Sequence, residues 1–411
     1  MLSTSETGSE SISPYLNKMP PELKNEIPKE SDIENNFKRF EDVQLPIDIL
    51  LLTVKDIEFR SCYFNLTNAF QSYWNGLGFV YFGEMGEVGD TKLKVALFKC
   101  SEGATNPGGA LIAVQNTVKK LRPKAVFCVG CCGALHRDKT KLGDVVVSAK
   151  LTTYADKRVT NQGVYPLGFC VPVSAYISGL IQCAGYGWKA PLKNEEEGEL
   201  VKVHSDGEFL SGPEEIDSEK RRRELVERYP NAIAVEMDGQ GVFSAAHVLK
   251  MEWVVIKGVS SYVDGTASLT EDWKPFASAM AASVVKNMLR TPAVFEGWSH
   301  YPSSDMGRAP NEDREPVMNS GANSGRNSPD ILWSLLHSVT SESGQHKFKG
   351  RVINYKAEGR FHKLKWVYDG TAWDVESGTS VKARDYNSAQ GAKEHAVKKL
   401  IDDLKAKGIL S

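Results

Sequence analysis

The feature that most constrains the fold is the segment 121–148, which reads LRPKAVFCVGCCGALHRDKTKLGDVVVS. Its apolar run Ala125–Val129 is rich in β-branched and aromatic residues, which favours a buried strand. The run ends in Gly130-Cys131-Cys132-Gly133-Ala134, small residues that let another chemical group approach the backbone closely. Open α/β sheets bind ligands where buried parallel strands end, so this turn is a candidate ligand site. An ordinary tight turn in an α/β core is the alternative.

The flanking sequence predicts further parts of such a sheet. A helix over Ala110–Leu121 leads into the strand, and Pro123 marks the boundary. The near-continuous apolar run Ile47–Val54 is typical of a central parallel strand and leads to Glu58. We expect Glu58 at the end of this strand or in the first turn of a helix, where interaction with the helix dipole is the alternative role. The other predicted elements are strands at Phe79–Phe82, Lys92–Cys100 and Val145–Ser148, and helices at Arg60–Leu77 and Trp273–Leu289.

Length and charge narrow the class of protein. The chain has 411 residues, which is typical of two or three domains, and its 41% hydrophobic content suffices for a core. A net charge of −2 gives the whole chain no general attraction to nucleic acid or to acidic membranes. We expect no membrane span, since no apolar run reaches roughly 18 residues, and no signal peptide, since the N-terminus is polar.

The seven cysteines are odd in number and lie mostly in apolar runs, which indicates free thiols and a cytoplasmic location. The spacing Cys128-x-x-Cys131-Cys132 has one feature of a zinc or redox site. Because no second pair of ligands accompanies it, we interpret these cysteines as buried small side chains. We therefore expect neither a metal nor a cofactor.

Composition divides the chain into four parts. Residues 1–45 are rich in Ser, Glu, Lys and Pro and are expected to form a disordered leader. Residues 46–291 form the large predicted domain. Residues 292–328 are rich in Pro, Gly, Ser and Asn and are expected to form a flexible linker. Residues 329–411 form a small α+β domain.

Four markers occur in order between Ile47 and Leu289. They are Glu58; Gly130 and Gly133 followed by Leu142-Gly143-Asp144; Ala234–Gly239 (AVEMDG); and the strand Trp253–Val259 followed by Ser260-Ser261-Tyr262-Val263-Asp264. Together they resemble the nucleoside phosphorylase and nucleosidase superfamily, in particular its nucleosidase branch and nucleosidase-like immune effectors that attack adenine nucleotides. The resemblance implies an α/β fold with a three-layer αβα core.

The resemblance also implies roles for three acidic residues and a methionine. Glu58 matches the glutamate that activates the attacking water. Glu236 and Asp238 flank Met237; the second carboxylate accepts hydrogen bonds from the ribose hydroxyls, and the methionine packs against the sugar. Negative charge here stabilises the oxocarbenium-like ribosyl carbon as the base departs. Aspartate at 238 keeps the charge of the family's glutamate but has a shorter reach, and an exposed helix start is the alternative for both carboxylates.

Other residues are candidates for substrate binding. Asn106 lies in a loop of small residues that precedes a helix. The free N–H groups at the start of such a helix suit a ribose or a phosphate. Gly130, Cys131 and Gly133 form the turn after the central strand. Arg158 lies in a predicted loop from which it could reach a substrate phosphate.

Two departures from the family pattern bear on the reaction. Cys128 and Cys131 stand where hexameric phosphorylases carry Arg and Ser or Thr. A thiol cannot replace the charge-assisted hydrogen bonds that arginine donates to phosphate. Hydrolysis is therefore favoured over phosphorolysis. Ser261 stands where the family has an aspartate that donates a proton or hydrogen bond to the leaving purine. Losing a general acid costs about two to four orders of magnitude in rate. Asp264 could substitute; otherwise the site binds its ligand with slow turnover or none.

The C-terminal domain has a predicted helix at Asp330–Val339, short alternating strands over 347–384 and a helix at Ala389–Lys407. Its pattern F-H-K-L-K-W-x-Y-x-G-x-x-W from Phe361 resembles the anti-lipopolysaccharide factor and scygonadin family. The cysteines that form a disulfide in that family are absent here. One of the two positions lies near Ile353, and Asp374 stands at the other. The resemblance implies that the hairpin between them binds an anionic ligand such as lipopolysaccharide. Its basic residues are Lys356, Arg360, Lys363 and Lys365. A double-stranded RNA-binding domain is a less favoured alternative, and a solvated surface is the alternative for each basic residue.

Two functions follow as hypotheses. The first is a purine nucleosidase acting on nucleosides or nucleotides, an innate-immune effector whose output the C-terminal domain controls. The second is a catalytically impaired, nucleotide-binding pattern-recognition protein, motivated by Ser261. In both cases we expect a homo-oligomer.

Overall fold

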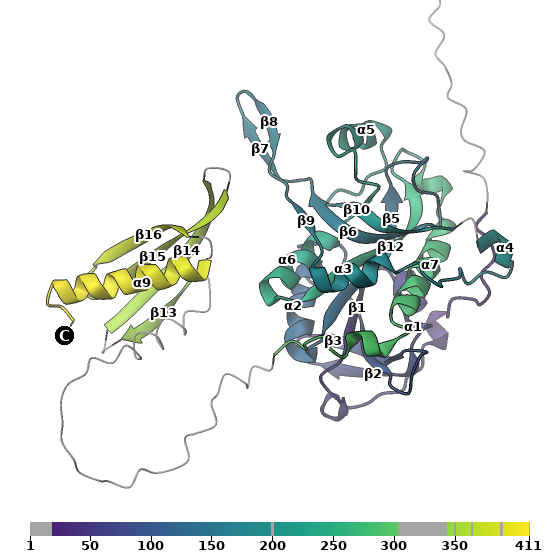
Figure 1. The fold of residues 1–411 in the computed structure, drawn as a ribbon, viewed down its shortest axis with the longest axis horizontal. Coiled ribbons are helices and arrows are strands. Elements are labelled where there is room, and N and C mark those ends of the chain that lie inside the picture. Colours follow the sequence, from purple (N-terminus) through teal and green to yellow (C-terminus); the bar gives the residue numbers. More distant parts are fainter. Residues whose placement is uncertain are drawn as a thin grey trace, which may run out of the picture. The chain divides into compact units, whose positions relative to one another are not determined.

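The computed structural model describes residues 19–198, 201–302, 343–348, 351–362, 365–386 and 389–410. The chain forms two compact units, Met1–Pro310 and Asn311–Ser411 (Figure 1). Among the described residues, no helix is both long and apolar enough to cross a membrane.

The described part of the first unit is built on a ten-stranded sheet with the order β11-β10-β6-β12-β5-β1-β4-β3-β2, and β9 pairs with β6. The strands are β1 (Ile49–Thr53), β2 (Thr67–Trp74), β3 (Gly78–Met85), β4 (Leu93–Lys99), β5 (Ala125–Ala134), β6 (Val145–Thr153), β9 (Cys170–Pro172), β10 (Val203–Ser211), β11 (Ala234–Glu236) and β12 (Glu252–Tyr262). A separate hairpin joins β7 (Lys157–Thr160) to β8 (Gly163–Pro166). The helices are α1 (Asp56–Tyr63), α2 (Ala110–Leu121), α3 (Ala175–Gln182), α4 (Glu195–Gly198), α5 (Glu219–Arg228), α6 (Gly239–Leu249) and α7 (Trp273–Met288).

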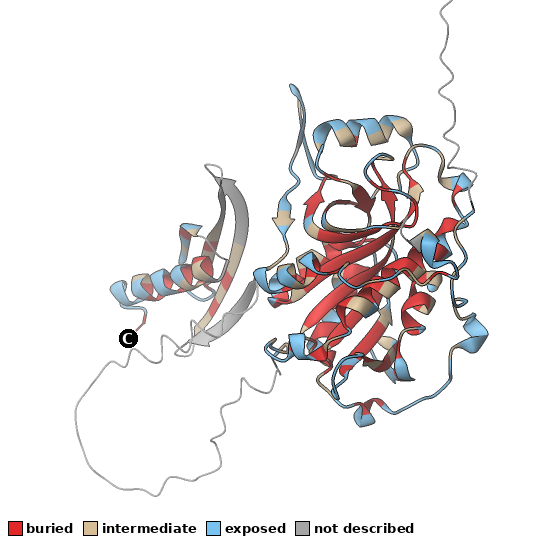
Figure 2. Ribbon diagram, turned by 45° about the vertical axis from the view of Figure 1, so that its right-hand side comes forward, coloured by how far each residue is buried: buried red, intermediate tan, exposed pale blue. Residues whose placement is uncertain are grey.

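Helices cover both faces of this sheet. α1 packs against α7, and α2 packs against α6; Figure 1 shows the two pairs on opposite sides of β1. The buried residues are concentrated in the central strands between these helices (Figure 2). The predicted α/β fold class is confirmed, as is the helix Ala110–Leu121.

Three of the strands that carry the site, β1, β5 and β12, run in parallel. All five residues of β1 are buried, and β1 pairs in parallel with β4 on one side and β5 on the other. β12 pairs in parallel with the other edge of β5. The carboxyl ends of β1, β5 and β12 therefore meet at one edge of the sheet, where ligand sites of such sheets lie.

The predicted helix Arg60–Leu77 is wrong. α1 begins at Asp56 and ends at Tyr63, and β2 follows, pairing antiparallel with β3. Thr67, Phe70, Tyr73 and Trp74 are β-branched or aromatic residues that favour a strand, and the partner strand supplies hydrogen bonds that the local sequence does not reveal.

The edges of the first unit also differ from the expected boundaries. Within the segment expected to be a disordered leader, Phe37 forms a bridge with β2 and Phe40 is buried in the core. Within the expected linker, Phe295 is fully buried. In these polar segments a few aromatic side chains gain enough burial to order the backbone around them. Residues 1–18 and 303–342, with the rest of the predicted leader and linker and the predicted helix Asp330–Val339, lie outside the described residues.

The second unit is a four-stranded antiparallel sheet with one helix, as far as its described residues extend. The strands β13 (Ser343–Phe348), β14 (Arg351–His362), β15 (Lys365–Asp374) and β16 (Ser380–Tyr386) pair in chain order. The helix α9 (Ala389–Ala406) packs on β14, β15 and β16. Gly370 permits the close packing, because a Cβ there would lie 2.0 Å from the carbonyl oxygen of Ala392 in α9. The predicted apolar face of the helix is confirmed as fully buried: Ala392, Ala396, Leu400, Ile401 and Leu404.

An ion pair closes the β14–β15 hairpin where the resemblance placed a disulfide. Ile353 lies opposite Asp374 in the register. The buried Asp374 carboxylate accepts hydrogen bonds from Arg351 Nε (3.1 Å) and Nη2 (2.6 Å) and from the backbone N–H of Ser377 (2.8 Å). The hydrogen bonds from the Arg351 guanidinium, aided by Ser377, lower the pKa of Asp374 to about 2.

The second unit is therefore expected to lose stability in acid. The pKa of Asp374 is lower in the folded state than the roughly 3.9 of an unfolded aspartate, so its contribution is complete above about pH 4 and is lost as the pH falls towards 2. Asp374→Asn should remove this pH dependence and destabilise the unit by about 1–3 kcal/mol at neutral pH. Hydrogen exchange of β14 and β15, corrected for intrinsic rates, measures both effects. Asp402→Asn, at an exposed site on α9, is the control; an equal loss in both variants would contradict the role of Asp374.

Candidate active site

A cavity of about 480 Å³ lies at the carboxyl ends of the parallel strands. Glu58 enters it from the first turn of α1, directly after β1, and Cys131 lies near the end of β5. Glu236 ends β11, Asp238 precedes α6, and Ser261 lies near the end of β12. The fold thus brings together groups that are up to about 200 residues apart in the sequence. Gly133 and Met237 also line this cavity.

Three backbone N–H groups fix the Glu58 carboxylate. Oε2 accepts hydrogen bonds from the N–H groups of Val54 (3.0 Å) and Lys55 (2.9 Å), which caps the first turn of α1. Oε1 accepts a hydrogen bond from the N–H of Cys131 (2.8 Å) in β5. Gly130 makes this approach possible, because a Cβ there would lie 2.3 Å from Oε1. Glu58 therefore does more than cap a helix: it joins α1 to β5 near the end of that strand. The turn predicted at 130–134 is wrong, because Gly130, Cys131 and Gly133 lie within β5 and pair with β12.

Glu236 and Asp238 form a second buried acidic group. Oε2 of Glu236 accepts hydrogen bonds from the N–H groups of Asp238 (2.9 Å) and Gly239 (2.9 Å). Oδ1 of Asp238 accepts a hydrogen bond from the N–H of Gly103 (3.2 Å), and Oδ2 accepts one from Nζ of Lys257 (2.9 Å). Both carboxylates are at least nine-tenths buried, so the exposed helix start considered from the sequence is not their environment.

Lys257 was missed at the sequence level. Its side chain is 1% exposed, and Nζ lies 2.9 Å from Asp238 and 3.9 Å from Glu236. Burial opposes its charge, but Asp238 and the neighbouring carboxylates raise the pKa of Lys257 well above its usual value, so it remains an ammonium ion. Burial raises the pKa of Glu236, although Lys257 opposes that shift. The available signal was a lysine inside the otherwise apolar strand WVVIKGVSS, since buried lysines are almost always paired.

Removing this cation should destabilise the first unit strongly. Lys257→Met leaves two carboxylates buried without their counterion, and breaking a buried pair in this way costs about 3–5 kcal/mol. Urea unfolding, followed by hydrogen exchange of the core strands, measures the loss. The double variant Lys257→Met/Asp238→Asn should recover part of it, and Lys119→Met, at an exposed site on α2, should change little. A loss below about 1 kcal/mol in Lys257→Met would show that the pair is not needed for stability.

The Cys131 thiol is held in its neutral form. Its Sγ lies 3.0 Å from the hydroxyl of Ser278 in α7. Burial, with a further contribution from the Glu58 charge, raises the pKa of Cys131 to about 12. The side chain contributes a small wall to the cavity rather than a nucleophile.

Ser261 reaches the cavity and Asp264 does not. Ser261 lies opposite Gly133 in the β12–β5 register, just after an irregularity in the pairing. Asp264 lies beyond the strand, where it accepts hydrogen bonds from Arg137 Nε (2.7 Å) and Thr266 Oγ1 (2.6 Å). Because these partners hold its carboxylate outside the cavity lining, Asp264 does not replace the missing aspartate in this arrangement.

Two other candidates also lie away from the cavity lining. The Asn106 amide donates a hydrogen bond to the carbonyl oxygen of Glu102 (2.8 Å). Arg158 is exposed on β7, in the hairpin that extends away from the rest of the first unit in Figure 1. In the second unit, Lys356 lies in β14 and is partly buried. The side chains of Arg360 and Lys365, and the whole of Lys363, lie outside the described residues.

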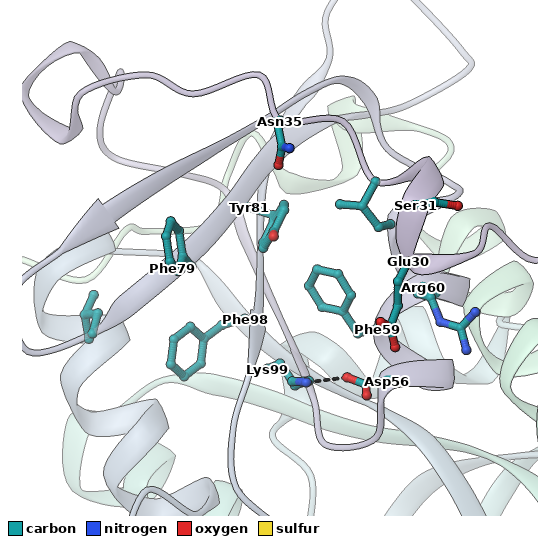
Figure 3. Close-up of a pocket in the computed structure, with 12 residues that line it drawn as sticks. Glu30, Ser31, Asn35, Asp56, Phe59, Arg60, Phe79, Tyr81, Phe98 and Lys99 are labelled. Carbon is teal, nitrogen blue, oxygen red and sulfur yellow. Dashed lines mark hydrogen bonds and ion pairs between the residues drawn. The ribbon is translucent and has the colours of Figure 1, made fainter.

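A different cavity, of about 530 Å³, is drawn in Figure 3. Its walls include the aromatic rings of Phe59, Tyr81 and Phe98, with an ion pair between Lys99 and Asp56 at one side. Asp56 lines both cavities. Because none of the converging carboxylates Glu58, Glu236 and Asp238 lines this second space, the cavity at the strand ends is the candidate active site.

Comparison with known proteins identifies the family of the chain. The family described as "Phosphorylase superfamily" matches residues 57–290, more than half of the chain. The chain belongs to the phosphorylase superfamily. The assignment of the large domain to this superfamily is thereby confirmed. Its likeness to immune effectors and the resemblance of the C-terminal domain stay predictions.

The relatives include nucleosidases. The chain is 27% identical over 270 residues to a death domain-containing ATP nucleosidase of Amphimedon queenslandica, a match covering 61% of this chain and 49% of that protein. The chain therefore spans about half the length of this relative. It is 26% identical over 201 residues to a 5′-methylthioadenosine/S-adenosylhomocysteine nucleosidase of Maridesulfovibrio salexigens, covering 48% of this chain and 82% of that protein.

Solved structures of bacterial nucleosidases are also similar. One is the 5′-methylthioadenosine/S-adenosylhomocysteine nucleosidase of Neisseria meningitidis in complex with methylthio-immucillin-A. It has 18% identity and a TM-score of 0.48, and the match covers 60% of this chain and 99% of that one. Another is the corresponding enzyme of Colwellia psychrerythraea in complex with adenine. Its identity is 18% and its TM-score 0.48, with coverage of 62% and 98%.

Proposed function

We propose that the first unit hydrolyses the N-glycosidic bond of a purine nucleoside or nucleotide. The observation that carries this proposal is the convergence of Glu58, Glu236 and Asp238 around one cavity at the carboxyl ends of the central strands. Three carboxylates beside one cavity suit a reaction whose transition state is a positively charged ribosyl cation.

Each carboxylate has a role that fits its contacts. Glu58, fixed by three N–H donors, accepts the proton of the attacking water. Asp238 accepts hydrogen bonds from the ribose hydroxyls with the lone pairs that Lys257 and Gly103 leave free. Glu236 holds the N–H groups at the start of α6 and adds negative charge near the sugar. Cys128 and Cys131, in place of an arginine and a hydroxyl residue, favour water over phosphate as the nucleophile.

A base-release assay tests the proposal. The protein is incubated with adenosine, inosine, 5′-methylthioadenosine, AMP and ATP, with and without inorganic phosphate, and free base is measured by chromatography. Release of base from at least one compound, independent of phosphate, is expected. No base from any of them, with or without an anionic ligand for the second unit, would refute the activity.

A second candidate function is a nucleotide-binding platform with impaired catalysis. Ser261 favours it, because a serine hydroxyl is a poor general acid at neutral pH. The ion pair between Asp264 and Arg137 supports it too, since it holds Asp264, three residues after Ser261, outside the cavity.

For the second unit we propose a sensor of lipopolysaccharide or another anionic ligand that controls an innate-immune output. The predicted basic hairpin, which includes Lys356, supports this proposal, and double-stranded RNA remains the less favoured ligand. Binding of the full chain to vesicles containing lipid A, compared with vesicles of neutral lipid and with double-stranded RNA, tests it. Equal binding to both kinds of vesicle would reject the sensor.

We also propose a cytoplasmic homo-oligomer. All seven cysteines lie in the described part of the chain and are free, which suits a reducing compartment. The β7–β8 hairpin exposes Val159, Val164 and Tyr165, with exposed fractions of 76%, 52% and 48%, and a second copy of the chain would cover such a surface. Sedimentation of the full chain, compared with a variant carrying Ser at these three positions, measures the oligomeric state. A monomeric unmodified chain would refute this part of the proposal.

A further inference from the structure

The candidate active site is strongly acidic. Nine of the described residues that line the cavity are carboxylates, whereas Lys55 and Lys274 are the lining residues with positive charge. Three of the nine are the buried Glu58, Glu236 and Asp238. The other six lie at less buried positions, which we call the acidic mouth: Asp56, Glu102, Glu214, Glu215, Asp217 and Glu271.

The positive charges near the acidic mouth are already used in ion pairs. These pairs join Lys55 to Glu102, Lys274 to Glu271, Arg221 to Glu214 and Lys99 to Asp56. Burial alone would lower the pKa of Lys55, but Glu102, together with Glu58 and Glu215, raises it. No lysine or arginine of the described chain lies within ion-pair distance of Glu215 or Asp217, so neither carboxylate is neutralised by an ion pair.

These two carboxylates are held next to the end of β12. Glu215 and Asp217 lie in the loop between β10 and α5. Oδ1 of Asp217 accepts a hydrogen bond from the N–H of Ala267 (3.2 Å), and the N–H of Ser218 donates to the carbonyl oxygen of Val263 (3.3 Å). Ala267 and Val263 both line the cavity. The negative charge is therefore fixed at the site and not carried by a free loop.

The cavity is small enough that the carboxylates of the acidic mouth act electrostatically on the substituents of a bound nucleoside. A volume of about 480 Å³ is within the range of single small-molecule sites. A group on the 5′ carbon of a bound nucleoside then lies within roughly 8 Å, a Debye length at physiological salt, of some of these carboxylates. A phosphate there would meet like charges with no free cation among the described lining residues, whereas an ammonium or sulfonium group would meet opposite charges.

We propose that the acidic mouth selects nucleosides whose 5′ substituent is neutral or positively charged and rejects 5′-phosphates. This specificity rests on the proposed nucleosidase activity of the same cavity. It assigns to Glu215 and Asp217 a role in substrate choice, and it separates this chain from a nucleosidase that takes nucleoside triphosphates.

Substrates of matched size test the charge preference. Adenosine 5′-carboxamide and adenosine 5′-carboxylate differ mainly in charge, and 5′-amino-5′-deoxyadenosine adds a cation of similar size. In 50 mM salt we expect kcat/KM for the amide and the amine to exceed that for the carboxylate about 100-fold, and we expect 500 mM salt to reduce the difference. AMP and ATP should remain poor substrates with Mg²⁺ present. Efficient hydrolysis of the carboxylate, of AMP or of ATP in either condition would overturn the proposal.

Variants locate the effect. Glu215→Gln/Asp217→Asn should reduce the preference for the amide over the carboxylate about tenfold, whereas Glu227→Gln, at an exposed site on α5, should not. Binding of the same compounds to Glu58→Gln, measured by calorimetry, gives a readout without turnover. If no compound releases base but the amide and the amine bind more tightly than the carboxylate, the nucleosidase activity fails and the charge preference stands. If base is released but charge has no effect on binding or on kcat/KM, the preference fails and the activity stands.

Discussion

Glu58→Gln is expected to lower kcat/KM for base release by about 10²–10⁴-fold, the usual contribution of a general base. The side-chain amide cannot accept the proton of the attacking water. It also places an NH₂ group against an N–H donor in either orientation, since both oxygens of Glu58 accept hydrogen bonds from the backbone. Initial rates of base release with a saturating and a limiting substrate concentration separate the effect on kcat from the effect on KM.

The control for this variant is Glu41→Gln, which makes the same chemical change at an exposed position and should leave the rate unchanged. Because the amide faces backbone donors, a loss of stability accompanies the loss of activity, so the unfolding midpoint of Glu58→Gln has to be measured beside its rate. A fully folded Glu58→Gln protein that binds substrate and retains more than about a tenth of the rate would show that another group activates the water.

The sequence contained most of the information that places the acidic groups of the site. Glu58 follows an apolar strand, and in AVEMDG carboxylates interrupt small and apolar residues, but the roles of these residues were implied by the resemblance of the four ordered markers to the superfamily. The sequence could not show which groups from other strands form hydrogen bonds with these carboxylates. The backbone donor of Cys131 and the ammonium group of Lys257 come from strands that lie far from Glu58 and Asp238 in the chain, and only the sheet register brings them within hydrogen-bond distance.

The wrong predictions also arise from strand pairing, which the local sequence does not reveal. Residues 60–77 contain enough apolar residues for a helix, and the strand Thr67–Trp74 depends on β3 for its hydrogen bonds. Arg158 was assigned to a loop over the site because its sequence is basic and polar, yet its hairpin pairs with itself through β8. By contrast, α2 was predicted with its correct ends because a loop of small residues precedes it and Pro123 follows it, and both signals are local.

Ser261 decides between the two functions proposed for the first unit. Ser261 lines the cavity, and a Cβ on Gly133 would lie 3.7 Å from its hydroxyl oxygen, so the side chain faces the glycine segment near the end of β5. An aspartate at this position would place a carboxyl group in the partly buried cavity wall beside Gly133. Burial among other carboxylates raises the pKa of such a group, which favours the protonated form that a general acid needs.

Ser261→Asp is therefore expected to raise kcat for base release by about 10²–10⁴-fold if the unmodified chain is slow. The gain should decline as the pH rises, because the new carboxyl group must be protonated in order to donate to the leaving purine. Rates measured from pH 5 to pH 9 for both proteins provide the comparison. Ser261→Asn is the matched control, since its amide donates a hydrogen bond but transfers no proton, and its gain should be small and independent of pH.

The outcomes separate the candidates because they depend on different residues. A slow unmodified protein that Ser261→Asp accelerates has retained the sugar-binding carboxylates and the water-activating glutamate and lacks the general acid, which supports the impaired binding protein. A fast unmodified protein needs no acid at position 261, so departure of the base must be driven mainly by the charges of Glu58, Glu236 and Asp238 around the ribosyl cation. In that case Ser261→Asp adds little, and Asp238→Asn should reduce the rate more than any substitution at Ser261.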